Sequence, residues 1–179
     1  MKYIALLRGI NVGGNNKVAM VDLKQCFEEL GFESVQTYIN SGNVLFETKE
    51  TDKASLVKKC ETALEVRFGF VVICAVITAQ ELHNAVARAP EWWGADTSVK
   101  HNAIFVIAPA STQDIMQQVG EARPEYEHVA ACEPIIFWSA PVETFSRTRY
   151  IKIVGSKCYK SVTIRNAIPT KKLVELSKD

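Results

Sequence analysis

The sequence lacks the long apolar runs that a membrane protein requires. Its longest mostly apolar stretch, Phe70–Ala79, is about half the length of a transmembrane helix. The apolar segment at the start of the chain is short and is interrupted by Arg8. This pattern is not that of a secretory signal peptide. We therefore expect a cytoplasmic protein with no membrane association.

Paired cysteines are also missing. The five cysteines are odd in number, are scattered, and show no CxxC spacing: Cys26, Cys60, Cys74, Cys132 and Cys158. This usage indicates reduced thiols in a cytoplasm. Four of them fall at apolar positions of predicted helices or strands, where cysteine acts as a small hydrophobic residue. Cys158, in a polar stretch flanked by lysines, is the one candidate for a reactive thiol.

The chain lacks the usual catalytic and metal-binding motifs. Its three histidines, His83, His101 and His128, do not have the spacing of metal ligands, and no HExxH or GxSxG motif occurs. Ser41 and Ser146 have no evident histidine partner. The sequence thus predicts no metal site and identifies no catalytic residue or cofactor. It leaves open whether the protein is an enzyme.

Charge is nearly balanced overall but unevenly distributed. The formal net charge of +1 argues against a dedicated, strongly basic nucleic-acid-binding protein. From Thr144 to Val174, however, the chain has no acidic residue and eight basic ones. Such asymmetry indicates either an anionic partner or a solvated basic surface.

Apolar periodicity predicts two successive βαββαβ units. In the first, strands are expected at Tyr3–Leu7, Val35–Ile39, Val44–Glu47 and Val71–Ile77, with helices at Met20–Leu30 and from Asp52 to about Phe68. In the second, strands are expected at Ala103–Ala108, His128–Cys132, Ile135–Trp138 and Val162–Arg165, with helices at Thr112–Val119 and Glu143–Val154. A helix near Gln80–Arg88 and the loop Pro90–Val99 connect the units, and a terminal helix begins near Thr170.

These elements predict an α+β protein of tandem ferredoxin-like halves with antiparallel sheets packed together. The expected boundaries are 1–78 for the N-terminal half, 79–101 for the connection, and 102–179 for the C-terminal half with its terminal helix. Several strands are continuously apolar, so both faces of each sheet should be covered. That feature disfavours an open RNA-recognition sheet. Trp92 and Trp93 are expected to cover an edge of the core.

Three motifs resemble a known family. They are Arg8–Val18 followed by Met20 and Leu23, then Thr37–Val44, and near the end Thr163–Asn166. Together they resemble the bacterial family catalogued as domain of unknown function 1697, along nearly the whole chain. The resemblance implies the same tandem ferredoxin-like architecture and brings no catalytic mechanism. The closing motif departs from the family pattern, because residues 167–170 stand where Trp-Asn-Thr is usual.

A binding site is predicted at one end of the first sheet. With a strand order of 4-1-3-2, the loop after the first strand and the turn after the second lie at the same end. The predicted anion-binding residues are Arg8, Asn11, Gly13, Gly14, Asn15, Asn16, Lys17, Asn40, Ser41 and Asn43. Backbone N–H groups at glycines and at a helix start favour phosphate. Glycine and asparagine also suit left-handed turns, so turn architecture alone remains the alternative interpretation.

The leading functional hypothesis is therefore an uncharacterised protein that binds a phosphate-containing small molecule or nucleotide. The alternative is a nucleic-acid-associated protein that uses Arg147, Arg149, Lys157, Lys160, Arg165 and Asn166. A third hypothesis is an enzyme that acts on a phosphorylated substrate. Ligand identity and oligomeric state are left open.

Overall fold

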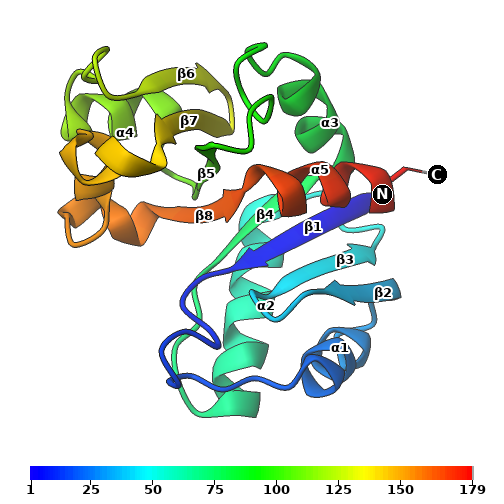
Figure 1. Cartoon of the computed structure of the whole chain (residues 1–179). Coiled ribbons are helices and arrows are strands. Elements are labelled where there is room, and N and C mark those ends of the chain that lie inside the picture. The colour runs from blue at the N-terminus through cyan, green and yellow to red at the C-terminus, as the bar shows by residue number, and fades with distance from the viewer. Residues whose placement is uncertain (179) are drawn as a thin grey trace. The chain divides into compact units, whose positions relative to one another are not determined.

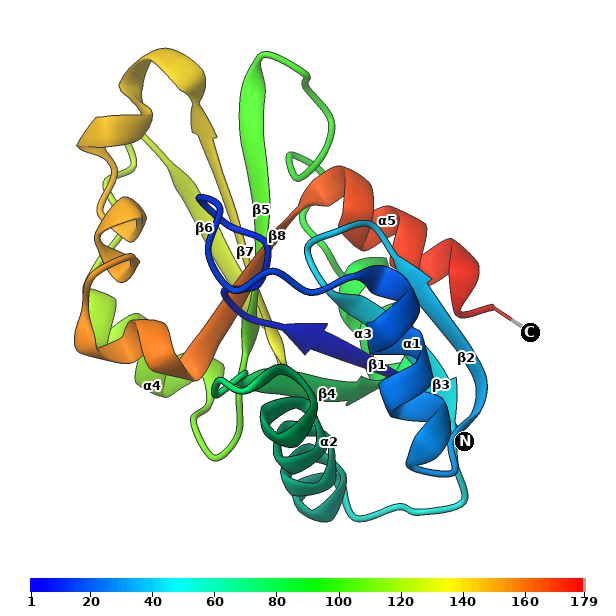
Figure 2. The same ribbon diagram turned by 90° about the horizontal axis from the view of Figure 1, so that it is seen from below.

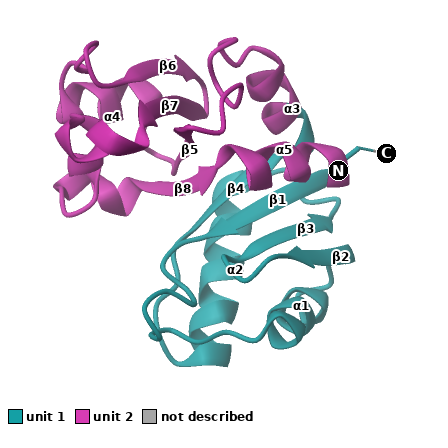
Figure 3. Cartoon of the chain, in the orientation of Figure 1, with its two compact units in different colours: residues 1–80, 177–179 teal, residues 81–176 magenta. Residues whose placement is uncertain are grey.

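The computed structural model describes residues 1–178 and divides into two compact units (Figure 3). Unit 1 contains Met1–Gln80 and the C-terminal residues from Ser177, and unit 2 contains Glu81–Leu176. In the part of the chain described, no helix is both long enough and apolar enough to cross a membrane.

Unit 1 is a four-stranded antiparallel sheet with two helices on one face (Figures 1 and 2). Its elements are β1 (Lys2–Leu7), α1 (Met20–Glu29), β2 (Glu33–Tyr38), β3 (Asn43–Glu47), α2 (Lys53–Phe68) and β4 (Cys74–Thr78). The strand order β2-β3-β1-β4 is the predicted 4-1-3-2 order. The last strand begins at Cys74 rather than at Val71. The preceding Val72 is nevertheless buried, so its apolar character reflects core packing outside the sheet.

Residues close together in the sequence determine where α2 begins and which of its faces is buried, as predicted. The Asp52 carboxylate accepts hydrogen bonds from the backbone N–H groups of Ala54 and Ser55 at the helix start. Leu56, Cys60 and Leu64 are fully buried on one face of the helix. Because successive apolar residues four positions apart share a face, this stripe packs α2 onto the sheet.

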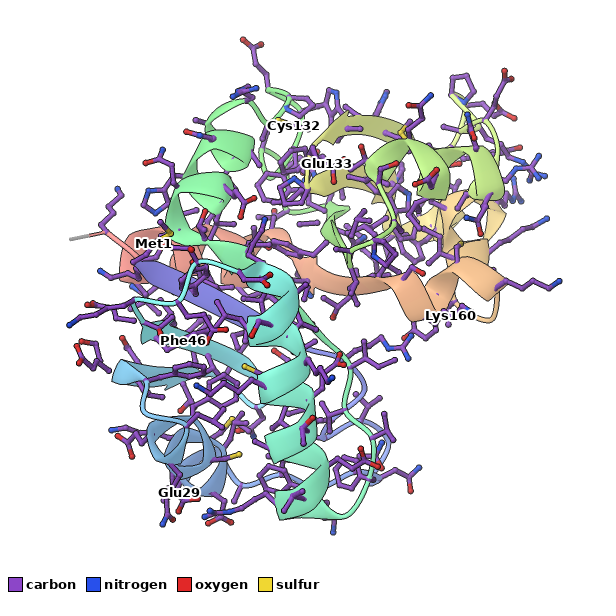
Figure 4. All side chains as sticks on the ribbon, turned by 180° about the vertical axis from the view of Figure 1, so that it is seen from behind. Met1, Glu29, Phe46, Cys132, Glu133 and Lys160 are labelled. Carbon is purple, nitrogen blue, oxygen red and sulfur yellow. The ribbon has the colours of Figure 1, made fainter. Side chains whose placement is uncertain are left out.

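Aromatic rings fill the core between this sheet and its helices. Phe46, labelled in Figure 4, stacks on Phe32 with ring centroids 4.4 Å apart and on Tyr3 at 5.6 Å. On the opposite face of the strands, Ile4 and Leu6 have no exposed surface. Both faces of the inner strand β1 are therefore buried, as predicted, whereas the edge strand β2 exposes Glu33, Ser34 and Gln36.

Unit 2 repeats the sheet order. After α3 (Ala79–Ala87), its elements are β5 (Val99–Val106), α4 (Thr112–Val119), β6 (His128–Cys132), β7 (Ile135–Pro141), the 3₁₀ segments η1 (Val142–Arg147), η2 (Tyr150–Ile153) and η3 (Lys157–Ser161), β8 (Val162–Asn166) and α5 (Ala167–Leu176). The sheet is antiparallel, in the order β6-β7-β5-β8. Glu133, labelled in Figure 4, accepts hydrogen bonds from the N–H and hydroxyl of Thr112 and ties the β6–β7 turn to α4.

The predicted helix at Glu143–Val154 is wrong, because the chain forms two separate 3₁₀ segments there. Thr148 is extended, with φ −65° and ψ 155°, and interrupts the turns. The buried carboxylate of Glu127 accepts hydrogen bonds from the N–H groups of Arg149 and Tyr150. In a continuous helix these N–H groups would bond to carbonyls one turn back. A side chain distant in sequence therefore takes the place of the helical bonds.

Two smaller expectations also need correction. The terminal helix begins at Ala167 rather than Thr170, because Pro169 lies in the first turn, where its missing N–H costs no helical bond. Cys158 lies in η3 and is only 4% exposed. It is therefore not an accessible loop thiol.

The described cysteines are all free thiols. Burial raises the pKa of Cys60 to about 12 and places the pKa of Cys74 well above its ordinary value. Both thiols are therefore protonated at neutral pH and act as small core side chains, as the sequence predicted.

Candidate functional site

The two predicted loops of unit 1 do lie together. Asn11 Nδ2 donates to the carbonyl oxygen of Asn40 at 2.9 Å, across 29 residues of sequence. The N–H of Leu7 donates to the carbonyl oxygen of Gly42 at 2.8 Å. Both β1 and β2 pair antiparallel with β3, so they run in the same direction and end at the same edge. The predicted adjacency of these loops is confirmed.

Three asparagines in this region hydrogen-bond to the backbone, although only Asn43 is buried and Asn16 is exposed. Asn11 donates to the Val18 carbonyl and accepts from the Val18 N–H, at 2.9 and 2.8 Å. Asn16 Nδ2 donates to the carbonyl of Gly9. Asn43, fully buried, donates to the carbonyl of Tyr38 and to Ser41 Oγ. These side chains therefore stabilise the turns, as the turn-architecture interpretation expects.

Besides Asn16, several of the predicted residues lie at the surface. Gly13, Gly14, Asn15 and Lys17 are exposed, and so is Asn40. Gly13 and Gly14 have φ values of +59° and +79°, and a Cβ at either position would meet no atom within 4 Å. The tip of the β1–α1 loop is thus open backbone, which a ligand can approach closely.

Two further features border this tip. Arg8 is partly buried, and its N–H donates to the carbonyl of Ile73, which joins β1 to the segment before β4. Helix α1 begins at Met20, and the side chain of its N-cap residue Ala19 makes no capping bond. No acidic residue precedes Asp22 in the sequence. The cationic side chains and the N-terminus of α1 therefore make the electrostatic potential near this tip more positive.

The predicted nucleic-acid-binding residues of unit 2 differ in their exposure. Arg147, Lys157, Lys160 and Asn166 are exposed, whereas Arg149 is only partly so. Arg165 is 7% exposed and donates to Thr163 Oγ1 and to the Ile164 carbonyl. Desolvation by burial lowers the pKa of Arg165 to about 10. It remains charged at neutral pH, held inside the unit.

The nucleic-acid interpretation stays a prediction, and it can be tested by salt dependence. If the exposed cations bind phosphates, affinity for DNA or RNA should fall steeply with added salt. Replacing Arg147, Lys157 and Lys160 by alanine should then reduce the slope by about one per lost contact. Filter binding from low to moderate salt measures the slope, with Lys49→Ala/Lys58→Ala as the control. No retention at low ionic strength would exclude this role.

The structure also reveals a serine–histidine contact that the sequence analysis missed. His101 Nδ1 lies 2.6 Å from Ser139 Oγ, and His101 Nε2 lies 2.7 Å from the carbonyl oxygen of Asp96. Only the β5–β7 register, which pairs His101 with Ser139, could have indicated this contact. Ser139 is 1% exposed, so a substrate cannot reach its hydroxyl in this structure. The contact is therefore structural here.

Trp93 occupies the role expected of the tryptophan pair. It is 4% exposed, packs edge-on against Phe137, and donates from Nε1 to the carbonyl of Asn102. Trp92 lies against the ring of His128. Trp93 thus covers an edge of the core of unit 2.

Unit 2 contains a cavity of about 570 Å³ that the sequence did not indicate. It lies between α4 and β6, and its lining includes Met116, Ala122, Val129, Ala131 and Tyr150. The volume falls in the range of small-molecule pockets. The lining residues come from separate elements, so no sequence motif identifies them.

These observations define a mixed α and β protein of two four-stranded antiparallel sheets, each with helices. The chain belongs to the family described as Protein of unknown function (DUF1697), which matches residues 1–137. This confirms the resemblance inferred from the motifs.

Comparison with solved structures supports the same conclusion. A conserved bacterial protein of Streptococcus pneumoniae, SP0830, is similar to this chain with a TM-score of 0.87 and 32% sequence identity. The similarity covers 99% of this chain and 98% of that protein. The search of curated proteins found no match.

Proposed function

We propose that unit 1 binds a phosphate-containing small molecule or nucleotide at the tip of the β1–α1 loop. The observation that carries this proposal is that the residues bonding to the loop backbone are not the same as the residues that offer ligand-binding groups at its tip. Asn11, Asn16 and Asn43 bond to the backbone, while Gly13, Gly14 and Lys17 remain exposed. The asparagine side chains thus hold the conformation of the loop, and the groups at its tip are not needed for this. A loop that is already ordered loses little conformational entropy when a ligand binds.

The chemistry of this tip favours an anion. Exposed backbone N–H groups at positive-φ glycines allow close approach of phosphate oxygens. Lys17 and Arg8 supply positive charge. The first turn of α1 follows within a few residues and adds free N–H groups and the positive end of the helix dipole. Asp22 in that turn is the nearest acidic residue in the sequence.

The test is a ligand-induced thermal shift. The probes are inorganic pyrophosphate, a nucleoside triphosphate and a hexose 6-phosphate. A probe at 100 times its Kd should stabilise the protein by about 2.7 kcal/mol, a rise in Tm of several degrees. Arg8→Ala and Lys17→Ala should abolish the shift. The control Lys49→Ala, which removes another exposed lysine, should keep it.

Two results would contradict the proposal. One is the absence of any shift with all three probes at millimolar concentration. The other is an equal shift in Lys17→Ala and Lys49→Ala. A large fall in the Tm of ligand-free Arg8→Ala would make Arg8 structural, and Lys17→Ala would then decide the question.

We further propose that both units have the ferredoxin-like topology and that the protein acts in the cytoplasm. The first point is supported by the sheet orders, in which the first strand of each unit lies between the third and the fourth. The second is supported by cysteines that are all free thiols among the described residues.

A further inference from the structure

The cavity between α4 and β6 in unit 2 has apolar walls. Val129 and Ala131 are two residues apart in β6, so they share one face of the strand. Met116 from α4 and Ala122, shortly after that helix, also line the cavity. A dry apolar cavity of about 150 Å³ holds a benzene molecule. With about 570 Å³, this one has room for an apolar molecule of two fused rings.

Tyr150 brings a polar group to this cavity. The residue lines the cavity and is only 1% exposed. Its N–H donates to the Glu127 carboxylate, but within residues 1–178 its hydroxyl has no hydrogen-bond partner. The hydroxyl is also not one of the fully enclosed unpartnered atoms of the described chain, so it meets open space. Because a buried tyrosine hydroxyl usually has a partner, this one is available to a ligand in the cavity.

The Tyr150 hydroxyl is a hydrogen-bond donor that is already held in place. Burial and the nearby Glu127 carboxylate raise the pKa of Tyr150 to about 12, so the phenol keeps its proton at neutral pH. Its ring packs against Trp138 with centroids 6.2 Å apart, and its backbone N–H is bound by Glu127. A donor fixed in this way loses little conformational entropy when it binds an acceptor.

The lining of the cavity does not favour an anion. None of the lining residues carries a positive charge, and the one charged residue among them is the exposed Glu121. An anionic ligand would lose its bonds to water without gaining a cationic partner, which costs free energy. The other polar side chains on the α4 side, Gln113 and Gln117, are neutral. The ligand that fits is therefore uncharged and mostly apolar, with an oxygen that accepts from the phenol.

We propose that the cavity between α4 and β6 binds an uncharged small molecule whose apolar rings pack against Met116 and Val129 and whose carbonyl oxygen accepts a hydrogen bond from the Tyr150 hydroxyl. The thioether of Met116 adapts its shape to a ring and makes favourable contacts with aromatic edges. This ligand differs in charge from the phosphate compound proposed for unit 1, and the two sites share no residue.

The experiment is a ¹H–¹⁵N NMR titration of the full chain with three probes: tetralone, tetralin and tetrahydronaphthoate. Tetralone differs from tetralin by one carbonyl oxygen, and tetrahydronaphthoate carries a carboxylate. The backbone amides of Met116, Gly120 and Val129 should shift saturably with tetralone. Tetralin should bind about fivefold more weakly, because it cannot accept the hydrogen bond of the phenol. Tetrahydronaphthoate should bind at least about tenfold more weakly, because its charge has no partner.

Two tyrosine variants assign the effect to one hydroxyl. Tyr150→Phe removes the hydroxyl and keeps the ring, so it should bind tetralone only as weakly as the wild type binds tetralin. Tyr126→Phe changes a partly exposed tyrosine outside the cavity lining and should bind tetralone as the wild type does.

The proposal is overturned if tetralone causes no saturable shift, if tetralin or tetrahydronaphthoate binds as tightly as tetralone, or if the two tyrosine variants bind tetralone equally. Should Tyr150→Phe fail to fold, Ala131→Phe provides a second test. Ala131 is an exposed lining residue, so a phenylalanine there fills the cavity from its open side and should abolish the tetralone shift. An unchanged shift in Ala131→Phe would also overturn the proposal.

Discussion

Replacing Gly42 by alanine should lower the free energy of unfolding by about 3 kcal/mol. Gly42 has φ +77°, a conformation that costs an alanine about 1 kcal/mol. A Cβ there would also lie 2.6 Å from Ile10 Cδ1 and 2.9 Å from Leu7 Cβ. Such overpacking typically costs a further 1–3 kcal/mol, roughly. The hairpin would have to move away from β1, which would strain the Asn11–Asn40 hydrogen bond.

The matched control is Gly13→Ala. Gly13 has a similar φ of +59°, but a Cβ added there would have no atom within 4 Å. Gly13→Ala should therefore lower the free energy of unfolding by only about 1 kcal/mol, the cost of the positive φ for alanine. Urea unfolding of both variants measures the difference. If the two variants were equally stable, the close approach of the hairpin to β1 would be refuted.

Replacing Glu127 by alanine should cost about 3–5 kcal/mol of stability. The Glu127 carboxylate is 2% exposed and accepts hydrogen bonds from the N–H groups of Arg123, Arg149 and Tyr150. Removing it leaves three donors without an acceptor, and each buried unpaired donor costs about 1–3 kcal/mol. Water entering the vacated space would offset part of this loss. Because η2 begins at these N–H groups, the segment should also lose its ordered start.

Thermal and urea unfolding of three variants tests this expectation. Glu127→Gln retains one acceptor oxygen and should lose less stability than Glu127→Ala. Glu125→Ala changes an exposed residue two positions away and should stay within about 0.5 kcal/mol of wild type. Equal stability of the two alanine variants would show that the carboxylate does not organise this region.

Much of the fold was predictable because its signals are local. Asp52 begins α2 through bonds to the next few residues, and the stripe from Leu56 to Leu64 repeats at the helical period. The continuous apolar character of β1 correctly indicated that both its faces are buried. In contrast, Glu143–Val154 also has helical spacing but does not form a helix. There, the Glu127 carboxylate accepts hydrogen bonds from the N–H groups of Arg149 and Tyr150, and no local sequence pattern indicates that contact.

The candidate site, too, could be predicted from the sequence only in part. Strand order alone predicted that the loops after β1 and β2 would meet, and the Asn11–Asn40 hydrogen bond confirms it. The sequence did not separate the asparagines that stabilise turns from the groups left at the surface. Asn15 and Asn16 are adjacent and chemically identical, yet only Asn16 donates to the carbonyl of Gly9. That distinction depends on the direction of a single side chain in the folded loop.

The sequence by itself thus determined the family, the alternation of strands and helices, and the end of the first sheet where polar loops gather. These follow from periodicity, turn residues and strand order, which act over short stretches or through topology. Only the tertiary structure decided that Arg165 is buried, that His101 meets Ser139, and which donors in unit 2 lack partners. Each of these depends on side chains brought together from distant segments, where register and packing select the partner.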